Sequence, residues 1–189
     1  MKTIKTCKQA PRKPAKRLQA TQFNKKASTY LGYTTHFLKD NAIVKLIDPV
    51  KVVRCKTGNG IRLGLANLCN EDKTAIMEQE RQLITAFNGI SSKFRSLFPT
   101  AVDIEETGRD MIFVNTTNNG TTLFNGDRER VPLVDALPRV STCRIALAFV
   151  GIKVKENEVS PMVRAHQLMI ANNDDAEDDE GGCMFTDEE

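Results

Sequence analysis

Opposite charges occupy opposite ends of this 189-residue chain, and this separation limits where a folded core can form. Residues 1–26 carry nine Lys or Arg and no acidic residue, whereas residues 171–189 carry nine Asp or Glu and no basic residue. Both segments are too polar to bury a core, so we expect them to be disordered. The sequence therefore predicts one folded domain over residues 27–170, between a basic arm and an acidic tail.

The middle of the chain alternates short apolar runs with turn residues, which is typical of a β domain. Residues 42–55 are rich in Ile and Val but are interrupted at Asp48-Pro49, which predicts a strand with a bend. A Gly58-Asn59-Gly60 turn predicts a hairpin before an alternating strand over 61–68. A further turn at 118–120 predicts another hairpin, and the remaining strands are expected at 111–114, 122–124, 144–155 and 162–170.

One segment has the periodicity of a helix instead. Apolar residues between Ile76 and Leu97 recur at spacings of three, four and seven, so they share one helical face. We expect Gly89 to divide this helix and Pro99 to end it. The predicted fold is mainly β with one long helix: an OB-like small barrel that carries residues 71–98 as an inserted helix.

Catalytic motifs are missing from the sequence. His36 and His166 have no Cys, His or carboxylate neighbour at metal-ligand spacing, and no phosphate-binding glycine loop or HExxH motif occurs. We therefore expect no enzyme activity, no metal and no cofactor. Five cysteines without CxxC spacing indicate a reducing, intracellular compartment. No apolar run is long enough to span a bilayer, so no membrane partner is expected.

The basic arm is the first candidate for binding nucleic acid. Two prolines keep this segment extended, and an extended cationic segment can follow a phosphate backbone and release counterions. A nuclear localisation signal and a solvated tail that only aids solubility are the alternatives. The candidate phosphate contacts in this segment are Arg12, Lys13, Lys16, Arg17, Lys25 and Lys26.

Aromatic residues next to basic ones suggest a single strand as the ligand, because unpaired bases stack on exposed rings. Tyr30, Tyr33 and Phe37 interleave with polar residues, but their spacing also fits one face of a short helix packed on the core. We assign Phe37 to the core and the two tyrosines to a stacking surface. Phe113 and Phe124 fit either reading. The candidate binding residues of the core are Tyr30, Tyr33, Lys39, Arg54, Lys56, Arg62, Arg144 and Lys153.

The acidic tail contains one apolar cluster around Phe185, between two groups of acids. Such a segment can be steered to a basic surface by its charge and can place the ring in a pocket. We predict that Asp178, Asp179 and Phe185 bind a partner protein. The basic groove of the same chain is the other target, which the tail would occupy until nucleic acid displaces it.

This layout resembles the single-stranded DNA-binding proteins of large DNA viruses and phages, which have an OB-fold core followed by an acidic tail with an aromatic residue. The resemblance rests on residues 43–55, 58–68 and 144–170 and on the tail from Asp174. It implies a protein that coats single strands during viral DNA replication or recombination, in the host nucleus or at the viral replication site. It also implies that the tail recruits replication proteins.

Two other functions remain open at this point. A virion or capsid-like structural protein would use the basic arm to neutralise the packaged genome, although the acidic tail would be repelled by it. A histone-chaperone-like module would use the tail to bind basic proteins, but would give the arm no role beyond nuclear import. RNA in place of DNA and assembly into homo-oligomers also remain open, since recognition of the 2′-hydroxyl is not visible in composition.

Overall fold

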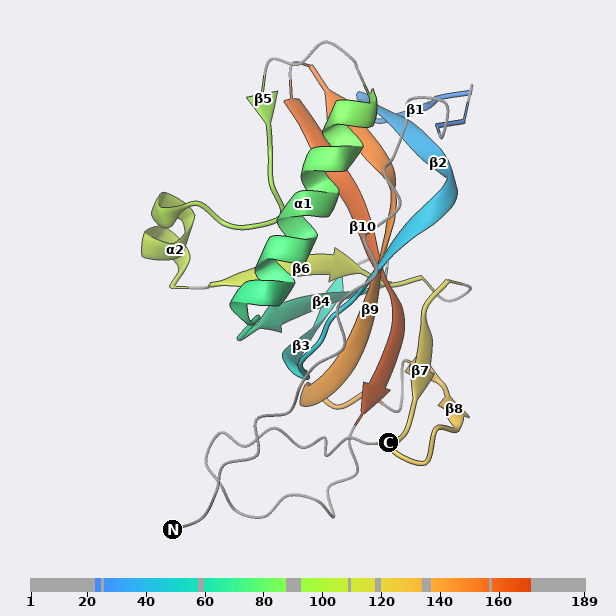
Figure 1. Cartoon of the computed structure of the whole chain (residues 1–189), viewed down its shortest axis with the longest axis vertical. Coiled ribbons are helices and arrows are strands. Elements are labelled where there is room, and N and C mark those ends of the chain that lie inside the picture. Colours follow the sequence, from blue (N-terminus) through green and yellow to red (C-terminus); the bar gives the residue numbers. More distant parts are fainter. Residues whose placement is uncertain are drawn as a thin grey trace.

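The computed structural model describes residues 23–24, 26–57, 60–87, 93–108, 110–117, 120–133, 137–156 and 158–170. Among them the fold is mainly β, with two helices (Figure 1). The strands are β1 (Ser28–Tyr30), β2 (Tyr33–Lys45), β3 (Val50–Thr57), β4 (Gly60–Ala66), β5 (Lys93–Phe94), β6 (Met111–Asn115), β7 (Thr122–Phe124), β8 (Arg130–Val131), β9 (Val140–Lys155) and β10 (Glu158–Ile170). The helices are α1 (Asn70–Phe87) and α2 (Ala101–Thr107).

Five strands close into a small barrel, as expected. The ring runs β3–β4–β6–β10–β9 and returns to β3. All of its pairings are antiparallel except that between β6 and β10, where Asn115 lies opposite Arg164 in a parallel arrangement. This closure joins segments almost fifty residues apart, so no local sequence signal specifies it.

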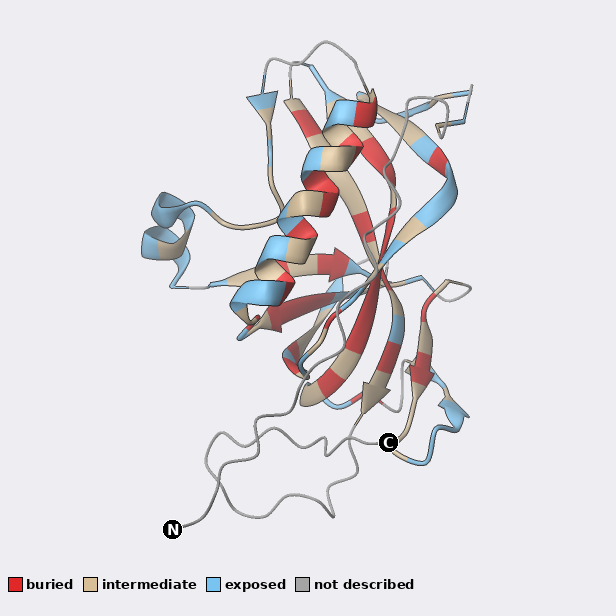
Figure 2. Ribbon diagram, in the orientation of Figure 1, coloured by how far each residue is buried: buried red, intermediate tan, exposed pale blue. Residues whose placement is uncertain are grey.

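The barrel core follows from the alternation of side chains along its strands. Leu63 and Leu65 of β4 and Ile112 and Val114 of β6 are fully or almost fully buried, while the residues between them face outward. The long strand β9 has neighbours on both edges, and its middle, residues 145–149, is buried without interruption (Figure 2). Phe149 on β9 is among the largest fully buried side chains of the core.

The β9–β10 hairpin extends beyond the barrel and forms a second sheet. β2 pairs with the later half of β9, β1 pairs with β2, and β5 pairs with the beginning of β10. The order of this part is therefore β1–β2–β9–β10–β5 (Figure 1). Gly151 permits the close approach of β2, since a Cβ there would lie 2.1 Å from the main-chain oxygen of His36.

Helix α1 covers one face of this second sheet. The His36 ring of β2 lies 4.9 Å from the Phe87 ring at the end of α1, measured between centroids. At the other end of α1, the buried Asp72 carboxylate accepts a hydrogen bond of 2.9 Å from the backbone N–H of Ile47. The helix is thus fixed at both ends, and the opposite face of the sheet is left uncovered by it.

Three expectations need correction. The single long helix over 71–98 is wrong: α1 ends at Phe87, residues 93–94 form β5, and α2 is a second, short helix. Residues 42–55 form parts of two strands, because the chain breaks pairing around Asp48-Pro49 before β3 begins. The segments 111–114 and 122–124 do not form a hairpin with each other, since β6 and β7 both pair with β10.

Several local expectations are confirmed. β3 and β4 form the predicted hairpin, with Thr57 opposite Gly60. The strands expected at 144–155 and 162–170 are present as parts of β9 and β10, which form a second hairpin with Lys155 opposite Glu158. The predicted arm and tail fall outside the described residues, apart from residues 23, 24 and 26. In the part of the chain that the structure describes, no helix has the length and apolarity needed to cross a membrane.

Candidate nucleic-acid interface

A groove of about 1900 Å³ lies on the face of the second sheet that α1 does not cover. Residues opposite each other in neighbouring strands project from the same face, so the register identifies the side chains that line it. One row joins Thr35, Lys153 and Ser160, and the next joins Phe37, Gly151 and Met162. All of these except Gly151 line the groove.

The outer face of the barrel continues this surface. Asn115 of β6 lies opposite both Arg62 of β4 and Arg164 of β10, so the three side chains form a row across three strands. The neighbouring row places Phe113 opposite Gly64. Because Gly64 has no side chain, Met111 and Phe113 can lie close over the β4 backbone.

Cationic groups lie against two of the rings in the groove. The Arg62 guanidinium is 4.8 Å from the centroid of the Phe113 ring. The Lys153 ammonium is 3.4 Å from the centroid of the Tyr33 ring, and the Lys155 ammonium is 5.6 Å from it. Each pair is held by an attraction of about 0.5–1 kcal/mol. The groove therefore presents charge and aromatic surface together at two separate places.

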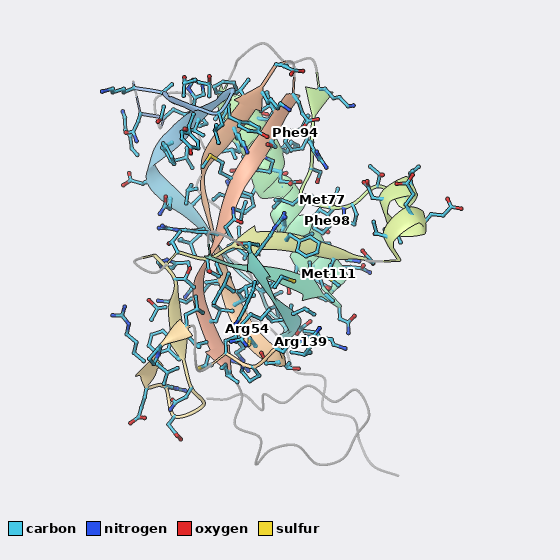
Figure 3. All side chains as sticks on the ribbon, turned by 180° about the vertical axis from the view of Figure 1, so that it is seen from behind. Arg54, Met77, Phe94, Phe98, Met111 and Arg139 are labelled. Atoms are coloured by element: carbon cyan, nitrogen blue, oxygen red, sulfur yellow. The ribbon has the colours of Figure 1, made fainter. Side chains whose placement is uncertain are left out.

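The remaining boundary is formed by residues 93–98, which we call the wall segment. It lies across the groove from β1 and β2, and Phe94 and Phe98 lie on the same side of the molecule as Met111 (Figure 3). Asp103 and Thr107 of α2 continue the lining beyond it. Helix α2 has no buried residue and projects away from the barrel (Figures 1 and 2).

The composition of the lining distinguishes this groove from an ordinary surface depression. It contains six basic and three acidic residues, so its formal charge is positive. It also contains six of the eleven aromatic residues of the whole chain. The aromatic residues are Tyr30, Tyr33, Phe37, Phe94, Phe98 and Phe113, and the basic ones are Arg62, Lys93, Arg95, Lys153, Lys155 and Arg164.

The structure brings together four of the predicted binding residues: Tyr30, Tyr33, Arg62 and Lys153 line the groove. Tyr30 and Tyr33 belong to strands and not to a helix, and Tyr30 is 74% exposed. The assignment of Phe37 to the core is wrong, because this side chain is 39% exposed and lines the groove.

Other predicted residues lie elsewhere. Arg54 and Lys56 are opposite Leu63 and Ile61. Their side chains therefore project from one face of the sheet, and that of Arg62 projects from the opposite face. Arg54 lies beside Arg139 near the lower end of the barrel (Figure 3). Arg144 is near the other end of β9 from the groove, and Lys26 and Lys39 are exposed but do not line it. The predicted residues outside the described part are Arg12, Lys13, Lys16, Arg17, Lys25, Asp178, Asp179 and Phe185.

Sequence reasoning missed several residues of the lining, among them Phe94, Phe98 and Arg164. Phe94 and Phe98 fell within the helix expected over 71–98, because the apolar spacing of α1 continues through this segment. Arg164 lies in an expected strand without an aromatic neighbour in the sequence, and only the pairing of β10 with β6 brings it to the groove. The Nε of Arg164 is buried and has no hydrogen-bond partner among the described residues.

A separate cluster has the composition of a metal site, and its Asp72 carboxylate has a structural role in joining α1 to the loop before β3. Single ligand atoms of Asp48, Cys69 and Asp72 lie within 4.8 Å of one another. The Asp72 carboxylate already accepts hydrogen bonds from the backbone N–H groups of Ile47 and Asp48. Burial raises the pKa of the Cys69 thiol to about 11. The cluster connects α1 to the loop before β3.

Comparisons with protein-family models, with curated proteins and with solved structures give no match for this chain.

Proposed function

We propose that the groove binds an unpaired strand of nucleic acid, with DNA as the ligand, and that the protein coats single strands as the proteins with a similar layout do. The observation that carries this proposal is the concentration of aromatic and basic side chains along one groove. Single-strand-binding proteins combine a positively charged channel that follows the backbone with rings on which bases stack.

The rings favour an unpaired strand over a duplex. Tyr30 and Phe37 are exposed, and Tyr33, Phe98 and Phe113 are only partly buried. Bases in a duplex are already stacked and paired, so their faces are not free to contact these rings. Each base that stacks on a ring contributes about 1–3 kcal/mol. A duplex would leave this surface without a partner.

The order of the barrel strands and the position of the groove on them also support an OB-type assignment. An OB-fold is a five-stranded Greek-key barrel that binds oligonucleotides on its second and third strands and on the loops after its first and fourth strands. In chain order, the second and third barrel strands here are β4 and β6, which carry Arg62 and Phe113. The fourth and fifth are β9 and β10, and Lys155 at their turn lines the groove. Helix α1 is inserted in the chain between the second and third barrel strands, β4 and β6.

The basic residues fit contacts with phosphates. Arg62 and Arg164 flank Asn115 in one row, and Lys153 and Lys155 lie on β9. Arginine is suited to phosphate because its planar guanidinium can donate two parallel hydrogen bonds. Counterion release from a single strand gives a slope of about −0.7 per neutralised phosphate in log affinity against log salt. We therefore expect binding that weakens steeply as salt increases.

Titration of labelled oligonucleotides, followed by fluorescence anisotropy, tests the proposal. The full-length protein should bind a single strand more tightly than a duplex of the same sequence, at each of two salt concentrations. Phe113→Leu should weaken single-strand binding about tenfold, because it removes one stacking surface. Phe124→Leu is the matched control, since Phe124 is also half-buried in a strand but does not line the groove. Equal affinity for duplex and single strand, or equal effects of the two substitutions, would refute the proposal.

A further inference from the structure

A carboxylate of α1 holds the wall segment in place. Glu80 is only 3% exposed, although it is ionisable. Its Oε2 accepts a hydrogen bond of 2.8 Å from the Ser96 hydroxyl, and its Oε1 accepts one of 2.7 Å from the backbone N–H of Leu97. The Ser96 oxygen in turn accepts a hydrogen bond from the backbone N–H of Phe98. A side chain of α1 thus holds two residues that line the groove, Ser96 and Leu97.

Among the described residues, the other polar anchors of the wall segment lie at its beginning, while Leu97 and Phe98 at its end also pack against the hydrophobic core. Lys93 and Phe94 pair with β10, and the backbone N–H of Arg95 donates to the Val159 oxygen at 2.9 Å. The Arg95 guanidinium also forms an ion pair of 3.7 Å with Glu158. At the end of the segment, next to Phe98, the Ser96 hydroxyl and the Leu97 backbone N–H donate the hydrogen bonds that connect the segment to Glu80 of α1.

A buried carboxylate is a costly way to stabilise a fold. Burial raises the pKa of Glu80, which means that the ionised form is disfavoured at this place despite its two hydrogen bonds. An apolar side chain of similar volume is often as stabilising as a buried ionic group. A Glu here is better explained by the direction of its two acceptors, which fix the course of the chain at Ser96 and Leu97.

We propose that Glu80 is a positioning residue for strand binding: it sets the position of Phe98 and thereby the shape of the groove. This inference rests on the proposed function, because it assigns Phe98 a contact with the bound strand. Loss of the carboxylate removes the hydrogen bonds from α1 to Ser96 and Leu97, so the Phe98 ring is held only by its packing on the core and presents a less fixed surface to a base.

A double-mutant cycle on oligonucleotide affinity tests this inference. Phe98→Ala should weaken single-strand binding about tenfold, as expected for one stacked base. Glu80→Ala should weaken it by a similar factor, and the double variant should lose no more than Phe98→Ala alone, because both changes remove the same contact. A residue that contributed to binding independently of Phe98 would give losses that multiply, and one that acted only on stability would leave the affinity of the folded variant unchanged. Glu78→Ala is the matched control. Glu78 lies on the same helix, but its carboxylate accepts hydrogen bonds from Arg81 and none from the described wall segment.

Two further variants keep the test decisive where Glu80→Ala does not fold. Ser96→Ala removes one of the two bonds, and Glu80→Gln retains one acceptor, so both should give smaller losses of affinity than Phe98→Ala. Folding of each variant is checked by circular dichroism. Folded variants of Glu80 that bind as tightly as the wild type, or whose effects multiply with that of Phe98→Ala, overturn the inference. A wild-type protein that binds no oligonucleotide overturns the proposed function itself, so the two failures are distinguishable.

Discussion

At the scale of single residues, the groove separates arginines that sequence reasoning treated alike. Arg62 lies over Phe113 in the groove, while Arg54, on the paired strand, projects from the other face. Because side chains alternate along a strand, a shift of one position decides whether a charge reaches the ligand. The aromatic spacing near the first strand did indicate Tyr33, and the basic residues of the later strand indicated Lys153; the structure brings these two side chains into contact.

We predict that Arg62→Gln lowers the affinity for single strands and makes the slope of log affinity against log salt shallower by about 0.7, the value for one phosphate contact. Arg130→Gln is the control, because Arg130 is exposed in strand β8 and does not line the groove. Anisotropy titrations at several salt concentrations measure both quantities. An unchanged slope for Arg62→Gln would show that its charge does not contact the backbone.

We also predict a dependence of stability on pH that originates at Glu80. Burial raises the pKa of this carboxyl above its ordinary value of 4.5, so the folded state binds the proton more tightly than the unfolded state does. The contribution of Glu80 to stability is therefore greatest at low pH and is lost as pH rises through the raised pKa. Urea unfolding at several pH values should show Glu80→Gln gaining stability relative to the wild type as pH increases. A constant difference between the two proteins would disprove this assignment.

At the scale of elements, local chemistry predicted the β3–β4 hairpin but failed for the hairpin expected at 118–120 and for the end of the helix. The Gly58-Asn59-Gly60 turn could be predicted because its residues suit the backbone of a tight hairpin. The end of α1 could not, since the apolar spacing of the helix continues through Phe94 and Leu97. In the structure these residues belong to β5 and to the wall segment, where pairing with β10 overrides the local preference. Barrel closure between β6 and β10 likewise depends on a contact distant in sequence.

The approach of β2 to β9 gives a prediction at this scale. Gly151→Ala should reduce the free energy of unfolding by about 1–3 kcal/mol, because the new Cβ meets the rigid main chain of β2 at His36. Gly64→Ala is the matched comparison: its Cβ would meet the Met111 sulfur, at the flexible end of a side chain, and should cost less. Urea denaturation measures both. The opposite order of the two losses would show that the β2–β9 contact is not the tight one.

At the scale of the whole molecule, the two charged ends flank a core with a positively charged groove. A segment with nine acids and no basic residue resembles a polyanion in charge, so we expect residues 171–189 to compete with nucleic acid for the groove. The basic arm should add affinity through further phosphates. The sequence indicated these roles through charge alone, whereas the groove itself became visible only when distant strands were brought together.

Removal of residues 171–189 should therefore raise the affinity for single strands, and the gain should shrink as salt increases. A full-length variant in which the nine acids are replaced by Asn or Gln separates charge from length, and it should show the same gain. Anisotropy titrations of the three proteins measure the effect. If neither variant binds more tightly than the wild type, the tail does not compete for the groove.

Intrinsic tyrosine fluorescence tests the central claim most directly, because the chain has no tryptophan and both of its tyrosines, Tyr30 and Tyr33, line the groove. Addition of a single-stranded oligonucleotide should change this emission with the same midpoint as the anisotropy titration, and a duplex at equal concentration should change it much less. Tyr33→Phe should reduce the change. Binding of the single strand that leaves tyrosine emission unaltered would show that the ligand lies elsewhere and would contradict the account.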